Sequence, residues 1–299
     1  MNAERTPYSE DLIQTHPALG ILRLAALFAS DERAPDDETL EMMFEQVAAG
    51  TLSGMTPAEA WPELMRGLMA QAPANMLRAL QACGALAEIL PEVAALFGVP
   101  QIANDPPEVD IGLHLLRVLD ETARCNAPLP VRFAALVMNV GKADSPPEHL
   151  PVHYRHVERG GPRIKAMCKR LGVSPECQDM ALLALAECER VHRVSEIRAG
   201  PVAAMLQRLG AFDQPQRYMQ FMTLCACDYR AYPNRETQDY PKVALLDIAL
   251  KACAAIDENK LTAGQSTTDA TETTDTLQES HAAAIAIVFG SERWSGPTT

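Results

Sequence analysis

The stretch EVDIGLHLLRVLDETARC, residues 108–125, has the clearest secondary-structure pattern in the chain. Its apolar residues recur three or four positions apart, which places them on one side of a helix. The residues of this stripe are Ile111, Leu115, Val118, Leu119 and Thr122. The spacing predicts an amphipathic helix that buries one face.

Helical patterns of the same kind fill the sequence on both sides of this stretch. Thr56 precedes Pro57, and Glu59 follows three positions after Thr56, which is the pattern of a capping box at a helix start. No convincing run of alternating apolar and polar residues predicts a strand. We therefore expect an all-α fold built from short helices.

The composition limits the classes of function. The chain has 299 residues, 47% of them hydrophobic, and a formal net charge of −13. An acidic balance of this size counts against strong, unassisted binding to RNA or DNA, which usually requires a basic face. The sequence shows neither a secretory signal nor an apolar run of about 18 residues, so we expect a cytoplasmic protein without a membrane span.

The eight cysteines are spaced in a way that argues against a metal centre. None forms a C-x-x-C pair, and most lie in apolar helical patterns, which favours buried, reduced thiols. Cys225 and Cys227 are two positions apart, so on one helix they point to nearly opposite sides.

Several strings occur in order along residues 16–256 and resemble one known family. They are HPALGILRLAALFA, TPAEAWPELMRGL, CGALAEILPEVAALFGVP, EVDIGLHLLRVLD, VRFAALVMNVGK, HYRHVERG and CDYR. Together they resemble the bacterial tRNA nucleotidyltransferases, the CCA-adding enzymes, in their neck and their C-terminal HD phosphohydrolase domain.

The resemblance implies a division of the chain. We expect a flexible N-terminus at 1–15, a neck-like helical region at 16–100 and a degenerate HD-like helical bundle at 101–257. Residues 258–280 are rich in Thr and acidic residues, which predicts a disordered linker. The C-terminal segment 281–299 begins HAAAIAIVFG, which is compatible with a docking helix, an edge strand or a weakly ordered tail.

The family's nucleotide-adding chemistry resides in a head with two metal-binding aspartates, and no D-x-D precedes the neck here. The base-reading pattern E-D-x-x-R of the family falls on His16, Pro17 and Gly20, with Arg23 one turn further on. A later Glu-Arg pair falls on Ala58 and Glu59, and Glu63 alone matches the family's next acid. We expect that this chain alone does not add C or A to tRNA.

The resemblance also implies a set of HD-like positions. The helix that matches ALVMNVGK, residues 135–142, carries His-Asp in the family but Met138-Asn139 here. One further family His falls on Cys188. The positions that keep the family's metal-binding residue types are His114, His156, His192 and Asp228.

The two replacements weaken the site for a hard cation. The thioether of Met138 is a poor ligand for Mg²⁺ or Mn²⁺, and Asn139 offers a neutral oxygen without the charge that attracts such an ion. We therefore expect no catalytic residue and no cofactor. A modified but active site would need a divalent ion such as Mg²⁺, Mn²⁺ or Ni²⁺.

Three basic residues are candidates for binding phosphate or RNA. Lys142 follows Gly141, although a lysine near a helix C-terminus is also what the helix dipole favours. Arg193 and Arg198 form a short basic cluster, for which an ordinary surface cluster is the alternative interpretation. Asp228 with Arg230 is likewise open to interpretation as a structural ion pair.

These observations leave more than one function open. The first hypothesis is a non-catalytic relative of the family that binds a nucleotide, tRNA or a protein. The second is a metal-dependent phosphohydrolase that acts on 2′,3′-cyclic or nucleotide phosphates. The third is a truncated gene product with no function of its own, and a subunit of a split CCA-adding enzyme is a further alternative. The sequence does not predict an oligomeric state.

Overall fold

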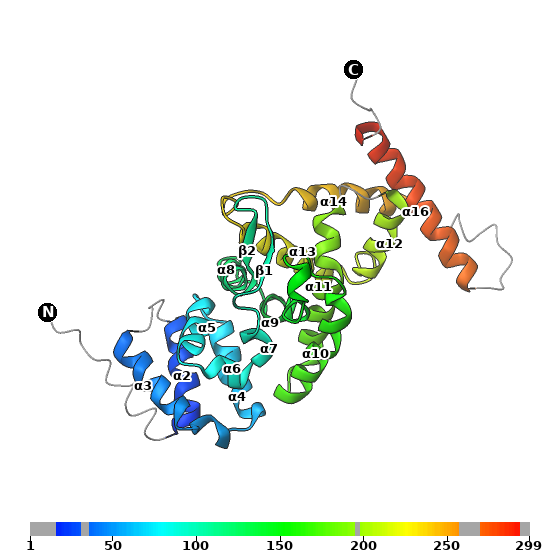
Figure 1. Ribbon diagram of the computed structural model, residues 1–299. Coiled ribbons are helices and arrows are strands. Elements are labelled where there is room, and N and C mark those ends of the chain that lie inside the picture. The colour runs from blue at the N-terminus through cyan, green and yellow to red at the C-terminus, as the bar shows by residue number, and fades with distance from the viewer. Residues whose placement is uncertain (1–15, 31–35, 195–197, 257–269, 294–299) are drawn as a thin grey trace. The chain divides into compact units, whose positions relative to one another are not determined.

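The computed structural model describes residues 16–30, 36–194, 198–256 and 270–293 (Figure 1). Helices dominate, and the described residues contain one two-stranded sheet. The all-α prediction is therefore confirmed. The predicted flexible N-terminus and the first part of the predicted linker lie outside the described residues.

The chain folds into two compact units. The first comprises the described residues up to Leu185 together with Ala226–Gln238, and the second comprises Ala186–Cys225 and the described residues from Asp239 onward. The boundary falls inside α11 (Pro175–His192) and inside α13 (Pro215–Arg230). The expected division at residue 100 stays a prediction.

The first unit begins with a group of short helices. α2 packs on α4 and α5, and the fully buried Leu64 and Leu77 contribute to the core beneath them. The predicted capping box is present, since the backbone N–H of Thr56 donates to Glu59 Oε2 over 2.8 Å. The elements are α2 (Pro17–Ser30), α3 (Asp37–Ala48), η1 (Thr51–Gly54), α4 (Pro57–Leu68), α5 (Pro73–Ala82), α6 (Ala85–Ile89) and α7 (Pro91–Ala94).

The rest of the first unit carries most of the HD-like positions. The helix expected from residue 108 begins later, because the side chain of Asp110 caps it by accepting from Leu113 N over 2.8 Å. Residues 108–110 instead pair antiparallel with 100–102. The elements are β1 (Pro100–Ile102), β2 (Glu108–Asp110), α8 (Ile111–Arg124), α9 (Leu129–Val137), η2 (Val140–Lys142), η3 (Pro147–His149) and α10 (His156–Leu171).

In the second unit, the C-terminal helix α16 (Ala270–Arg293) packs on α12 (Ala199–Arg208) and α14 (Pro241–Ala254) (Figure 1). HAAAIAIVFG therefore lies in a helix, not in an edge strand, and buries Ile285 and Phe289. The helix also begins before residue 280, where the linker was expected to end. Once one part of a helix is docked, each residue added to it gains a hydrogen bond. The preceding residues can therefore be helical although their sequence has no clear helical pattern.

All eight cysteines are free thiols, and seven of them are buried. Burial raises the pKa of Cys168 and of Cys253 to about 11. At neutral pH these two side chains therefore behave as small apolar groups. Among the described helices, none is both long and apolar enough to cross a membrane.

Candidate functional site

Met138 and Asn139 lie where a buried helix ends. α9 stops at Val137, and Met138 closes its last turn by donating its N–H to Ala134 O over 2.9 Å. The carbonyl of Asn139 then accepts from Lys142 N over 2.8 Å, which starts the short helix η2. Both side chains are almost buried, at 5% and 7% exposure.

Gly141 holds this segment against α10. A Cβ at Gly141 would collide with the carbonyl oxygen of His156 and would lie 2.7 Å from Gly160 N. Arg159 donates from Nε to the Gly141 carbonyl over 3.0 Å. Gly141 is therefore required for close backbone approach, and it lies within η2 rather than at the end of α9.

His114 and Asp228 bind each other directly. Nε2 of His114 on α8 lies 2.9 Å from Oδ1 of Asp228 on α13, and both residues are buried. Nδ1 of His114 has no hydrogen-bond partner among the described residues. The His114 ring lies 4.3 Å from that of Tyr232. Arg230, the candidate ion-pair partner of Asp228, donates from Nε to the carbonyl of Gln238.

His156 at the start of α10, and His153 three residues before it, each contact a backbone carbonyl. His153 Nε2 lies 2.9 Å from Pro100 O, so this nitrogen carries the proton, and Nδ1 lies 2.8 Å from the Ser145 hydroxyl. His156 Nδ1 lies 2.8 Å from His153 O, so it also donates. A neutral His156 therefore keeps its lone pair on Nε2.

His192 lies in the second unit, in the last turn of α11. Its Nδ1 lies 2.8 Å from the Tyr240 hydroxyl, and its Nε2 lies 3.4 Å from Sγ of Cys188. Cys188 also lies 3.8 Å from Sγ of Cys225. The two HD-like positions of this unit are thus adjacent on one helix face.

Lys142 is buried rather than displayed to solvent. Its Nζ donates to Gln101 Oε1 over 3.0 Å, and Gln101 Nε2 donates to the Tyr232 hydroxyl over 3.3 Å. Sequence reasoning missed Gln101 and Tyr232. No local pattern could reveal them, because their partners are 41 and 131 positions away.

The other predicted basic candidates are on the surface. Arg193 is exposed and its Nε lies 3.4 Å from Glu189 O. Arg198 is exposed at the start of α12. Residues 195–197 between them lie outside the described residues. The assignment of both arginines as ligands of phosphate or RNA stays a prediction.

Residues that match the family's base-reading pattern make contacts within the protein. Gly20 is buried within α2, and its N–H donates to the carbonyl of His16. Arg23 donates to Glu63 Oε1 over 3.1 Å, and Arg66 approaches the other oxygen of the same carboxylate at 2.6 Å. Glu63 is buried, so Arg23 is occupied by an internal ion pair.

Within the first unit, the donor set does not fit a hard divalent ion. Asp228 supplies one carboxylate, and it is already hydrogen-bonded to His114. Asn139 supplies a neutral amide and Met138 a thioether. Mg²⁺ and Mn²⁺ favour several anionic oxygens, so these side chains offer too little charge.

The fold and these contacts define a class: a helical protein with a buried His–Asp pair and with a buried Met-Asn at the end of a helix. No family model matches the chain. Relatives named "Multifunctional CCA protein" do match. The one from Cupriavidus necator is 38% identical over 283 residues, which is 95% of this chain and 67% of that protein.

Two further relatives carry the same name. The protein from Polaromonas naphthalenivorans is 42% identical over 245 residues, covering 82% of this chain and 57% of its own length. The protein from Burkholderia vietnamiensis is 42% identical over 246 residues, covering 82% and 59%. The chain thus belongs to the CCA-adding enzyme family, and spans between 57% and 67% of the length of these relatives.

Proposed function

We propose that this chain is a non-catalytic HD-like member of the CCA-adding enzyme family that binds tRNA or a nucleotide without hydrolysing phosphate. The observation that carries the proposal is the pair of side chains at the end of α9. Met138 and Asn139 are buried there, and neither side chain supplies the negative charge that a hard cation requires. Their volumes are close to those of His and Asp, so packing is preserved while ligand chemistry is lost.

The direct contact between His114 and Asp228 supports the same proposal. In a hydrogen bond to a carboxylate, Nε2 of a neutral histidine carries a proton, so the nitrogen that faces Asp228 has no lone pair to give to a metal; the lone pair of this tautomer is on Nδ1. The contact therefore gives both residues a structural role: it satisfies a buried carboxylate that would otherwise be costly.

A metal-dependent phosphohydrolase is the second candidate. The observation that favours it is the pair of donors one turn apart on α11, with Cys188 Sγ 3.4 Å from His192 Nε2. A thiolate and an imidazole suit Ni²⁺ or Zn²⁺ better than Mg²⁺. Under this alternative the site would have changed its metal instead of losing it.

Hydrolysis of 2′,3′-cyclic AMP by the native chain tests the proposal. Mg²⁺, Mn²⁺, Ni²⁺ and Zn²⁺ are added in separate reactions, and a catalytically intact HD protein serves as the positive control. We expect no metal-dependent product above the chelator control. Hydrolysis that requires one of these ions and is lost in Cys188→Ala contradicts the proposal and supports the second candidate.

A further inference from the structure

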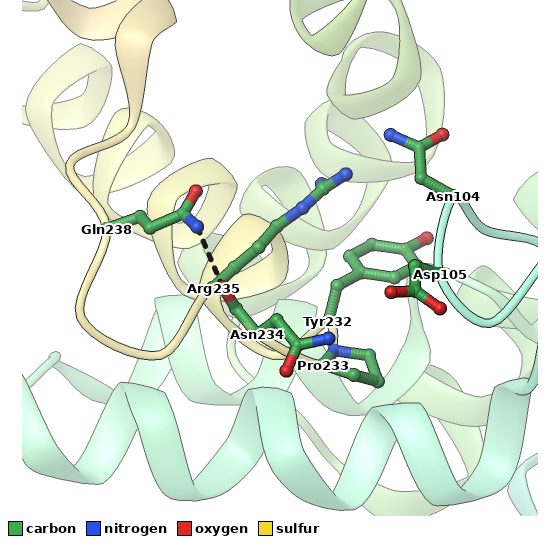
Figure 2. Close-up of a pocket in the computed structure, with 7 residues that line it drawn as sticks. All are labelled: Asn104, Asp105, Tyr232, Pro233, Asn234, Arg235 and Gln238. Carbon is green, nitrogen blue, oxygen red and sulfur yellow. Dashed lines mark hydrogen bonds between the residues drawn. The ribbon is translucent and has the colours of Figure 1, made fainter.

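A small cavity of about 140 Å³ lies in the first unit, and one of the residues that line it, Tyr232, contacts His114. One wall is the turn between β1 and β2, with Asn104 and Asp105. The other wall is the loop that follows α13, with Tyr232, Asn234 and Arg235 (Figure 2). The centres of the Tyr232 and His114 rings lie 4.3 Å apart.

The guanidinium of Arg235 is held in place by aromatic rings. It lies 4.6 Å from the centre of the Tyr229 ring and 5.3 Å from that of Tyr232. Such contacts orient the flat face of the guanidinium and leave its N–H groups directed outward. Among the described residues, no acceptor takes a hydrogen bond from the Arg235 guanidinium and no carboxylate pairs with it.

The loop that carries Arg235 is braced independently of any ligand. Gln238 Nε2 donates to Asn234 O over 2.7 Å, and the Tyr229 hydroxyl donates to Gln238 Oε1 over 3.0 Å. Asn234 adopts a φ of 65°, a left-handed conformation that asparagine tolerates and that closes the loop tightly. The cavity wall is therefore preorganised.

Asp105 lines the same cavity and is also unused. Within the described part of the chain its carboxylate forms no ion pair with Arg235 or with any other cation, and the Asn104 amide forms no hydrogen bond. Opposite charges that line one small cavity without pairing leave room for a ligand between them. That ligand must offer acceptors to Arg235 and donors to Asp105.

We propose that this cavity binds a single nucleobase, with guanine preferred. Guanine presents two acceptors, O6 and N7, on the edge that an arginine fork recognises. It presents two N–H donors on its other side, which a carboxylate can accept. Unstacked bases are commonly held against aromatic rings and guanidinium planes, and Tyr232 and Arg235 offer both. The base could belong to a free mononucleotide or to single-stranded RNA.

The inference rests on the proposed function only in taking a nucleotide or RNA as the class of ligand. The two fail separately, because hydrolysis assays test the HD-like positions and binding assays test this cavity. Base binding without hydrolysis supports both. Hydrolysis together with base binding contradicts the proposed function alone.

Calorimetric titration of the full chain with GMP, AMP, CMP and UMP tests the inference. In parallel, a pentanucleotide of adenosines with one central guanosine is compared with the all-adenosine form. We expect the strongest binding for GMP, for the guanosine-containing RNA, or for both, and the arm that responds identifies the source of the base. No preference for guanine in either arm overturns the proposal.

Three variants locate the binding. Arg235→Gln should weaken guanine binding about tenfold or more, since a bidentate arginine–guanine contact is worth about 1–3 kcal/mol. Arg235→Lys keeps the charge but not the fork, so it should lose nearly as much. Asp105→Asn should reduce the preference for GMP over AMP. Full binding by Arg235→Lys would show that the site reads phosphate charge, which overturns the proposal.

Arg155→Gln is the matched control, because it removes the charge of an exposed arginine outside the cavity. It should leave guanine binding unchanged. Thermal unfolding of each variant separates lost binding from lost folding, and the exposed Asp105 provides a test that does not disturb the braced loop. Equal loss in Arg155→Gln and Arg235→Gln also overturns the proposal.

Discussion

Nε2 of His114 and Oδ1 of Asp228 lie 2.9 Å apart in the interior of the first unit, where the exposed fractions of the two residues are 1% and 7%. Two residue types that the family resemblance assigns to metal binding thus form a hydrogen bond with each other. If the pair is structural, its removal should cost stability.

Asp228→Ala should therefore lower the free energy of unfolding by about 2–3 kcal/mol, because it removes a charge-assisted hydrogen bond and leaves a buried imidazole unpaired. Asp228→Asn keeps an oxygen that can accept from Nε2 and should lose clearly less. Urea unfolding followed by circular dichroism measures both. Equal stability of the native chain and the alanine variant would contradict a structural role for the His114–Asp228 pair.

Gly141→Ala should destabilise the first unit by about 2–3 kcal/mol, since the added methyl group meets the backbone of α10 rather than a movable side chain. Gly290→Ala is the control: it lies in α16, no proline follows it, and its added Cβ meets no atom within 4 Å. We expect it to be neutral or to stabilise by about 0.5–1 kcal/mol. Thermal unfolding compares the two, and a harmless Gly141→Ala would mean that the two segments are not in close contact.

The helices were more predictable from the sequence than their ends or the sheet. The helix at Ile111–Arg124 has a long apolar stripe whose spacing matches the helical period of 3.6 residues and not the alternation of a strand. The strands at 100–102 and 108–110 are too short to show alternation, and their pairing depends on the turn between them. Asp110 looked like part of the helix because a capping residue and a helical residue share the same polar character.

The site was predictable only where a family pattern pointed to it. His114 and Asp228 were both identified, but their direct bond was not, since nothing in the sequence relates positions 114 residues apart. Lys142 was predicted to meet phosphate because it follows a helix end. Its burial against Gln101 depends on the sheet that periodicity missed.

The C-terminal helix should contribute to the core of the second unit. Ile285→Ala should cost about 2–5 kcal/mol, because Ile285 is fully buried. Ile287→Ala, at a position that is 75% exposed, should change stability by less than about 0.5 kcal/mol. Hydrogen exchange in α12 and α14 reports the effect directly. The same protection in both variants would show that α16 adds nothing to this core.

Binding of the chain to tRNA, as proposed, should be weak and strongly dependent on salt. The net charge is −13, so contacts to phosphate must come from local basic groups such as Arg193 and Arg198. Such contacts release counterions, and the affinity falls as salt rises. Gel shifts at low and at physiological salt measure this. Tight binding that is unchanged at physiological salt contradicts this prediction.

Metal content tests most directly the central claim, which is that the HD-like positions of this chain no longer bind a metal ion. The native chain and the double variant Met138→His, Asn139→Asp are dialysed against Mn²⁺, Ni²⁺ or Zn²⁺, and bound metal is measured by mass spectrometry. The variant adds an imidazole and a formal negative charge at little cost in volume, so its affinity should rise. We expect the native chain to hold no stoichiometric metal and the variant to bind more. Stoichiometric metal in the native chain, together with hydrolysis of a cyclic phosphate, would contradict the account.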